Sequence, residues 1–340
     1  MGVDMKNYGI PYMGSKSKIL SLIHYLFERE YKCKYFIDMF CGGLAVSHYA
    51  LENSKFKVLA NDYNKYVISL YEEILYNKSK NIKKVWLNWV SRDTFMKVKE
   101  KPEKFEKWYV GYVLTIWSFG NRQDTYMFGK PIEKMKEALH NALVFNNWIQ
   151  LKKIDKLKDF DVDESIKNTD YKKQKNKRLL FMSSFKNFIK EKSTPELAQL
   201  KQLEQLQRLE RLQQLERLQQ SERLEQLQLF SDDWYAFYKT IPDEILKNAF
   251  IYCDPPYENT GKYQVGKNFD YLKFWEWVRN CPYSVYVSSY KAPEDIQKIN
   301  FELKNVLFTS NKGKRNVKKE NIYWNGKGNY EKTLYDMLFN

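Results

Sequence analysis

The sequence contains few of the residues from which metal sites are built. It has four cysteines and three histidines in 340 residues, and no two cysteines are spaced as Cys-x-x-Cys. The common zinc motifs are therefore excluded, and we predict no bound metal. Reduced thiols, as in a cytoplasmic protein, are the expected state of the four cysteines, which are Cys33, Cys41, Cys253 and Cys281.

Long apolar runs and targeting signals are also missing from the sequence. No apolar stretch approaches the roughly 18 residues that cross a membrane, and no secretory signal is found at the start. Gly2 is not followed by Ser or Thr at position six, so N-myristoylation is not indicated. We therefore expect no membrane partner and a cytoplasmic location.

Acidic residues are outnumbered by basic ones, 42 to 57, which leaves a formal net charge of +15. Such an excess favours a polyanionic partner such as nucleic acid, although an ordinary basic protein would have the same composition. Two basic runs lie at residues 171–178 and 312–320. For each run two interpretations stay open, phosphate contact or a solvated face.

Strand and helix signals alternate at both ends of the chain. We predict strands at residues 35–38, 56–60, 249–253 and 283–290, helices at 19–27 and 271–280, and a last strand at 332–340. Strands that alternate with helices are typical of a parallel sheet covered by helices. The predicted fold class is therefore α/β, with a Rossmann-like sheet.

The central region has a different pattern. Residues 85–100 and 131–149 have helical spacing, whereas "SFGNRQDTYMFGK", residues 118–130, is predicted to be a polar loop with aromatic edges. We therefore predict an α/β domain made of residues 1–75 and 245–340, interrupted by a largely helical region at 76–244.

Leucine recurs at every third position between residues 197 and 227 of that region. Ten of the eleven positions are leucine, and the other is Ser221. The composition favours one long helix over 195–230, with Pro195 in its first turn. On an α-helix, leucines spaced three apart shift around the helix by about 60° per step. Only a 3₁₀-helix would align them in a straight stripe, so the helix type stays open. The leucines are expected either to fold back on the same domain or to pair two chains.

Two acidic residues end the first two predicted strands. Asp38 is followed by Gly42 and Gly43, which allow a backbone to approach a ligand closely. Asp62 follows the second strand, where a carboxylate can bind both hydroxyls of a ribose. Asp62 alone would equally suit a helix N-cap, but the two turns together favour a nucleoside-type cofactor.

The stretch "DPPY" follows the strand at 249–253. Asp254 and the carbonyl of Pro255 can accept the two hydrogens of an exocyclic amino group, and Tyr257 can stack on a planar base. These acceptors would localise the lone pair of the aromatic amine for attack, which stabilises the charge that develops in the transition state. No cysteine nucleophile is needed. The alternative is a turn that only ends the strand.

Four stretches in this order resemble the Dam-like DNA adenine-N6 methyltransferases, and most closely their phage and prophage type. The stretches are YMGSK (12–16), DMFCGG (38–43), ND (61–62) and DPPY (254–257). The resemblance covers residues 8–75, 118–145 and 249 onward. It implies S-adenosyl-L-methionine as cofactor, double-stranded DNA as partner, methyl transfer to adenine N6 and a flipped target base. It also implies a restriction–modification setting in a bacterial or phage-infected cell.

The resemblance also implies roles for individual residues. Those expected at the cofactor are Tyr12, Gly14 and Lys16 above it, Asp38, Phe40 and Gly42 at its methionine end, Asp62 at its ribose, and Asp254. Those expected to hold the target adenine are Asp254, Pro255, Pro256 and Tyr257. Region 76–244 would recognise the target. Asn121, Arg122 and Tyr126 are expected to contact the DNA because of their place in the loop 118–130, and not because they match a motif of the family. The loop 118–130 and the leucine repeat depart from the family pattern, so no recognition sequence is implied.

Three alternative functions stay open at this point. Cytosine N4 is also an exocyclic amine, although Asp rather than Ser before the two prolines favours adenine. A methyltransferase that has lost catalysis and only binds DNA would not need the cofactor. RNA as the substrate is compatible with the same charge and aromatic content.

Overall fold

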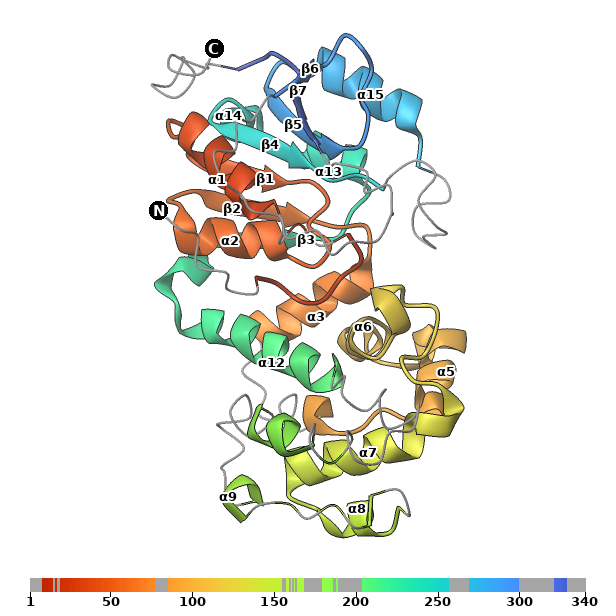
Figure 1. Ribbon diagram of the computed structural model, residues 1–340. Helices are drawn as coiled ribbons and strands as arrows, with labels where there is room; N and C mark the ends of the chain where they lie inside the picture. Colours follow the sequence, from red (N-terminus) through yellow and green to blue (C-terminus); the bar gives the residue numbers. More distant parts are fainter. Residues whose placement is uncertain are drawn as a thin grey trace. The chain divides into compact units, whose positions relative to one another are not determined.

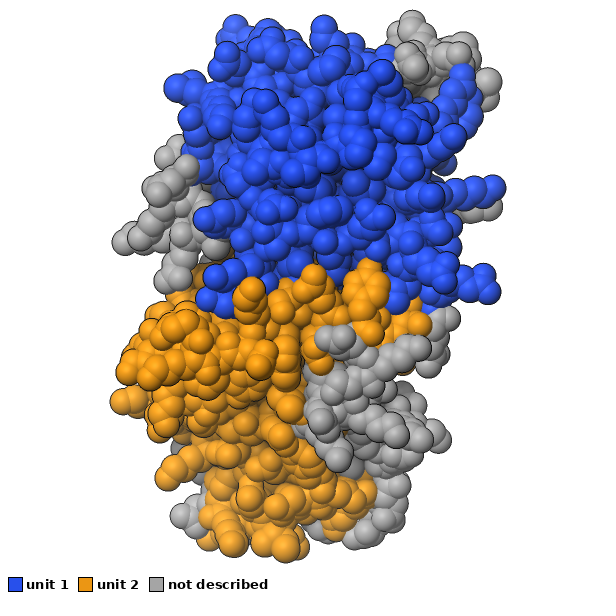
Figure 2. Space-filling model, turned by 180° about the vertical axis from the view of Figure 1, so that it is seen from behind, with its two compact units in different colours: residues 1–9, 14–68, 220–340 blue, residues 10–13, 69–219 orange. Residues whose placement is uncertain are grey.

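The structure is a computed structural model that describes residues 8–14, 16, 19–76, 85–154, 157, 158, 160, 162, 164–167, 179–185, 188, 204–256, 269–299 and 321–328. The chain divides into two compact units (Figure 2). The sheet unit comprises residues 1–9, 14–68 and 220–340, and the helical unit comprises residues 10–13 and 69–219. The boundary between them falls inside helix α3 (Lys65–Leu75).

The sheet unit is built on seven strands, in the order β3-β2-β1-β4-β5-β7-β6 (Figure 1). The first five in this order are parallel, and β7 runs antiparallel to both β5 and β6. The strands are β1 (Tyr35–Asp38), β2 (Lys57–Asn61), β3 (Leu227–Phe230), β4 (Ala249–Cys253), β5 (Ser284–Ser289), β6 (Gln297–Lys298) and β7 (Asn321–Trp324). The α/β prediction is confirmed, and β1 and β4 have the predicted bounds.

Helices cover both faces of this sheet. One face packs against α1 (Leu20–Arg29) and α2 (Ala45–Asn53), where Phe27 contacts Phe36 and Phe250 at ring distances of 5.4 and 6.1 Å. On the other face, Ile37 and Ile251 share a core with Phe274. That core includes residues of α13 (Trp234–Thr240), α14 (Asp243–Leu246) and α15 (Tyr271–Asn280). Strands buried on both faces are continuously apolar, which explains why β1 and β4 could be predicted from sequence.

Strand order reverses between β1 and β4. From β1 the chain continues to β2 on one side, and β4 lies on the other side of β1. In open parallel sheets, ligands bind at the carboxyl ends of the strands at such a reversal. Asp38 in β1 is in register with Tyr252 in β4. Asp254 comes two residues after Tyr252, so it lies just beyond the level of Asp38 at the same edge of the sheet.

The leucine repeat does not form one long helix. Its described part begins as α12 (Glu204–Glu216), continues as the 3₁₀ turns η5 (Arg217–Gln220) and η6 (Glu222–Gln226), and ends as strand β3. The helix prediction for residues 227–230 is wrong, because this segment pairs with the edge of β2. Residues 195–203 lie outside the described residues.

The α-helical leucines are buried inside the chain. Leu206, Leu209, Leu212 and Leu215 are each at most 3 % exposed, although they wind around α12. Arg208 on the same helix is also buried, and its Nη1 donates hydrogen bonds to the carbonyls of Ile116 (2.8 Å) and Ser118 (2.7 Å). The leucines of α12 therefore pack within the chain, whereas Leu224 of η6 is half-buried.

The helices predicted at 85–100 and 131–149 are confirmed in part, since α5 begins only at Arg92 and α7 ends at Phe145. The described elements of the helical unit, besides α12 and η5, are α5 (Arg92–Glu100), η2 (Pro102–Lys104), α6 (Lys107–Ile116), η3 (Phe119–Asn121), α7 (Lys130–Phe145), α8 (Ile149–Lys152) and α9 (Glu164–Lys167). The sheet unit resumes at residue 220 rather than at 245, since it contains β3 and α13. The basic runs 171–178 and 312–320 and the strand predicted at 332–340 lie outside the described residues.

Candidate functional site

Three carboxylates gather at the carboxyl ends of β1, β2 and β4. Asp38 ends β1, Asp62 follows β2, and Asp254 follows β4. Since β1 pairs in parallel with both β2 and β4, these three strand ends lie next to one another at one edge of the sheet. The structure therefore brings together the three acidic residues that the sequence predicted for one site.

Asp38 is almost completely buried, at 1 % exposed. Burial, with smaller effects from the charges of Asp254 and Asp62, raises the pKa of Asp38 to about 7, although the hydrogen bond from Ser47 acts in the opposite direction. Ser47 Oγ donates to Asp38 Oδ2 at 2.6 Å. The other oxygen, Oδ1, has no hydrogen-bond partner among the described residues. A buried acceptor of this kind suits a cationic donor group from a ligand.

Asp62 is oriented by two backbone N–H groups. Gly42 N donates to Asp62 Oδ2 at 2.9 Å, and Asn64 N donates to Oδ1 at 2.8 Å. These bonds lower the pKa of Asp62, but burial raises it by more. Each carboxylate oxygen keeps a second lone pair, so the pair of oxygens can still accept hydrogen bonds from two vicinal hydroxyls.

The turn after β1 brings the backbone toward these carboxylates. Gly42 has φ +44° and Leu44, directly before α2, has φ +59°, so the turn is left-handed at both positions. Cys41 N donates to the carbonyl of Asn61 at 2.8 Å, which ties the turn to the end of β2. Together with the buried Asp38 Oδ1 and the oriented Asp62, this turn fits a nucleoside with a cationic amino acid tail, as S-adenosyl-L-methionine is.

Lys16 pairs directly with Asp254. Its Nζ lies 2.7 Å from Asp254 Oδ2 and also donates to the carbonyl of Gly14 at 3.0 Å. The Lys16 side chain is 5 % exposed and that of Asp254 is 18 % exposed. A buried ammonium in this position balances part of the negative charge of the three carboxylates. Lys16 is therefore a buried partner of Asp254 and not an ordinary surface charge.

Residues 254–256, directly after β4, belong to no helix or strand and are called the shelf below. Pro255 is buried, and the carbonyl of Pro256 accepts a hydrogen bond from the hydroxyl of Tyr271 at 2.8 Å. Phe40, in the turn after β1, packs against Phe269 with ring centroids 5.8 Å apart. Tyr257, predicted to stack on the target base, lies outside the described residues.

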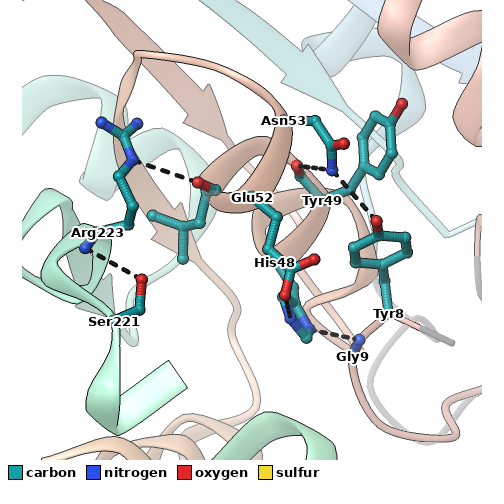
Figure 3. Close-up of polar contacts among 9 residues, drawn as sticks. Tyr8, Gly9, His48, Tyr49, Glu52, Asn53, Ser221 and Arg223 are labelled. Carbon is teal, nitrogen blue, oxygen red and sulfur yellow. Dashed lines mark hydrogen bonds and ion pairs between the residues drawn. The ribbon is translucent and has the colours of Figure 1, made fainter. Parts of the chain in front are cut away.

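Residues 8 and 9 are docked on α2 (Figure 3). Gly9 N donates to Nδ1 of His48 at 3.0 Å, and Asn53 Nδ2 donates to the hydroxyl of Tyr8 at 3.2 Å. Gly9 has φ +64°, and a Cβ atom there would lie 2.1 Å from the carbonyl oxygen of Gly43. Only glycine therefore allows this segment to lie against the turn after β1.

The carboxyl end of α2 is held by an arginine from the leucine repeat (Figure 3). Arg223 Nε donates to the carbonyl of Leu51 at 3.3 Å, and Arg223 Nη2 donates to the carbonyl of Ser54 at 2.7 Å. A cation is favourable at the end of a helix, where carbonyl groups lack helical partners. Since α2 carries Ser47, this contact helps to fix the helix that orients Asp38.

Tyr12 and Gly14 lie in the segment that the sequence predicted above the cofactor. Gly14 is exposed and has φ +80°, which favours glycine. Tyr12 is partly exposed and belongs to residues 10–13, which are grouped with the helical unit. Asp38, Phe40, Gly42, Asp62 and Asp254 are all in the sheet unit.

The predicted DNA contacts lie in a tight hairpin of the helical unit. Ser118 and Tyr126 form an isolated antiparallel bridge, and both Asn121 (φ +58°) and Gln123 (φ +63°) are left-handed. The side chain of Arg122 is 51 % exposed and pairs with Asp124 at 3.1 Å.

Tyr126 is the exception among the predicted DNA contacts. Its side chain is only 4 % exposed, and its hydroxyl donates to the carbonyl of Val90 at 2.7 Å. This position gives Tyr126 a structural role in place of the DNA contact predicted for it. Asn121 is half-buried, and its Oδ1 has no hydrogen-bond partner in the described part of the chain.

Sequence reasoning assigned no role to Ser47, Asn61 or Tyr271. Asn61 is buried, and its side chain bonds the carbonyl of Met39 and both the N–H and the carbonyl of Asp232. The only signal for Asn61 was its place before Asp62. Ser47 and Tyr271 had no signal, because each is an ordinary helix residue whose partner is distant in the sequence.

The cysteines near the site are not reactive. Cys41 and Cys253 are buried, and burial raises the pKa of both thiols well above the ordinary value. Within the described ranges, no group of three or more His, Cys, Asp or Glu side chains could hold a metal ion. Over the same residues, no helix combines the length and the apolar character needed to cross a membrane.

Comparison with known families gives one match that covers most of the chain. The family model for D12 class N6 adenine-specific DNA methyltransferases (MethyltransfD12) matches residues 12–277. The matched range begins at Tyr12 and includes Lys16, all three site carboxylates and the hairpin at 118–126.

Proposed function

Because the chain belongs to the D12 class N6 adenine-specific DNA methyltransferase family, we propose specific roles for its residues in that reaction. The family transfers a methyl group from S-adenosylmethionine to the N6 amino group of adenine in DNA. The observation that carries the proposal is the convergence of Asp38, Asp62 and Asp254 where the strand order reverses, with Lys16 paired to Asp254.

Asp38, Phe40, Gly42 and Asp62 are proposed to hold the cofactor, which supplies an electrophilic methyl group on a positively charged sulfur. Asp38 Oδ1, buried and available, accepts from the cationic amino group of its methionine part. Asp62, already oriented by Gly42 N and Asn64 N, accepts from the ribose hydroxyls. Tyr12 and Gly14 are proposed to lie above the cofactor, as the resemblance implies.

The shelf after β4 is proposed to hold the target adenine. Asp254 and the carbonyl of Pro255 accept the two N6 hydrogens, which localises the nitrogen lone pair toward the methyl group. Lys16 keeps the Asp254 carboxylate in place through its 2.7 Å contact. Pro256 stiffens the shelf, and Tyr257 stacks on the adenine ring.

The target adenine must leave the double helix to reach Asp254. Base flipping costs a few kcal/mol of stacking and pairing, which contacts to the DNA backbone and pocket repay. We propose that the hairpin at 118–126 contacts the DNA through the exposed Arg122 and through Asn121, whose Oδ1 is an available acceptor. Double-stranded DNA is the proposed substrate.

The first test is nucleoside mass spectrometry with Asp254→Ala. Purified protein is incubated with unmethylated genomic DNA and S-adenosylmethionine, and the digested DNA is analysed for N6-methyladenine and N4-methylcytosine. We expect N6-methyladenine from the wild type and at least a 100-fold lower rate from Asp254→Ala, with DNA binding within about threefold.

Asp295→Ala is the matched control, because it removes an exposed carboxylate that pairs with Arg279. It should methylate at the wild-type rate. Near-normal activity of Asp254→Ala would refute the proposed catalytic role. N4-methylcytosine as the product would keep the mechanism and refute the target base.

A further inference from the structure

Tyr271 contacts the shelf from the first residue of α15. Its hydroxyl donates to the carbonyl of Pro256 at 2.8 Å. The preceding residue, Asp270, caps the helix by accepting a hydrogen bond from Lys273 N at 2.9 Å. The phenol of Tyr271 therefore extends from a fixed helix start toward the peptide group that follows the two prolines.

This contact and the Lys16 pair anchor the shelf on both sides of Pro255. Before Pro255, the Asp254 carboxylate is held by Lys16 at 2.7 Å, and after it, the Pro256 carbonyl is held by Tyr271. No donor to the Pro255 carbonyl is found among the residues that the structure describes. The one carbonyl that is proposed to meet the substrate therefore lies between two anchored neighbours.

An aromatic chain links Tyr271 to the turn after β1. Phe269 packs edge-on against Tyr271, with ring centroids 4.9 Å apart, and against Phe40, at 5.8 Å. Phe40 also contacts Phe274 of α15 at 6.0 Å. The side chain that holds the shelf is thus packed against the turn that is proposed to bind the cofactor.

We propose that Tyr271 is a positioning residue for methyl transfer. Its hydrogen bond fixes the peptide plane after Pro256, and through the stiff Pro255–Pro256 pair it sets the direction of the Pro255 carbonyl. Without this bond the carbonyl samples other directions, so fewer bound complexes have both N6 hydrogens accepted. This inference rests on the proposed roles of Asp254 and Pro255.

Tyr271→Phe removes the hydroxyl and keeps the ring and its packing. Single-turnover transfer of radiolabelled methyl groups to unmethylated genomic DNA, with enzyme and S-adenosylmethionine in excess, reports the chemical step. We expect the single-turnover rate to fall about five- to tenfold, which corresponds to one hydrogen bond of about 1 kcal/mol. The dissociation constants for S-adenosylmethionine and for the DNA should stay within twofold.

Tyr286→Phe is the matched control for a purely structural loss. Tyr286 is buried in the same unit, and its hydroxyl donates to Glu30 Oε1 at 2.6 Å. It should lower the melting temperature at least as much as Tyr271→Phe does and leave the single-turnover rate unchanged.

Two results would overturn the inference. One is a Tyr271→Phe rate within twofold of wild type, and the other is a fall in rate matched by an equal loss of cofactor affinity. If Asp254→Ala is inactive in the same assay, either result refutes only the role of Tyr271 and leaves the proposed function standing. If Asp254→Ala is active, the proposed function itself fails.

Discussion

Replacing Asp38 with asparagine should make the stability of the cofactor-free protein less sensitive to pH. The folded protein raises the pKa of Asp38 from 3.8 to about 7, mainly through burial. An acid whose pKa is raised by folding stabilises the fold in its neutral form, and this contribution is lost as the pH rises toward 7. At about 1.4 kcal/mol per pH unit, the wild type should lose about 4 kcal/mol between acidic and neutral pH.

Asparagine cannot ionise, so Asp38→Asn should not show this loss. The amide oxygen accepts the bond from Ser47, but the amide places a buried NH2 group where Oδ1 was, at a constant cost of about 1–3 kcal/mol. This cost does not depend on pH. It therefore cancels when the difference in free energy of unfolding between mutant and wild type at pH 5 is compared with the same difference at pH 8. Because part of the wild-type loss has already occurred at pH 5, the difference should move in favour of the mutant by about 2–3 kcal/mol between pH 5 and pH 8.

Urea unfolding of both proteins at pH 5, 6, 7 and 8, followed by circular dichroism, measures this difference. Ser47→Ala is the companion variant. It removes a bond that favours the ionised carboxylate, so it should cost more stability at pH 8 than at pH 5. If the difference in free energy of unfolding between Asp38→Asn and wild type changes by less than about 1 kcal/mol from pH 5 to pH 8, the raised pKa of Asp38 is refuted.

Two further substitutions test the docked segment and the hairpin. Gly9→Ala places a Cβ 2.1 Å from the Gly43 carbonyl oxygen at a φ of +64°. It should therefore destabilise the sheet unit by about 2–3 kcal/mol, which is measured as a lower melting temperature. An unchanged melting temperature would mean that residues 8 and 9 are not docked on α2. Arg122→Ala should weaken binding to unmethylated DNA about tenfold, measured by filter binding, and Lys130→Ala, an exposed cation beyond the hairpin, serves as its control. Equal affinities for the two variants would contradict a specific role for the hairpin.

The strands that carry the site could be predicted from the sequence because their signals are local. β1 and β4 are short apolar runs buried on both faces, and each leads into an acidic residue. A parallel sheet brings such strand ends to one edge, so the sequence alone is enough to group Asp38, Asp62 and Asp254.

The leucine repeat could not be predicted correctly, because its local pattern favours helix throughout. The segment becomes strand at Leu227–Phe230 since β2 offers unpaired backbone groups there. A hydrogen-bonding edge elsewhere in the fold overrides the helical propensity of the segment. Likewise, no spacing rule distinguishes Tyr126 from Arg122 in a tight hairpin, although one is buried and the other exposed.

Residue types and strand ends are local properties, and they were enough to predict a parallel sheet with Asp38, Asp62 and Asp254 at the ends of its strands. Only the tertiary structure decided which partners orient these groups. Ser47 meets Asp38, Lys16 meets Asp254 and Tyr271 meets Pro256. The physical reason is that side-chain pairs between separate elements depend on how those elements pack, and a single sequence does not encode that packing in any local pattern.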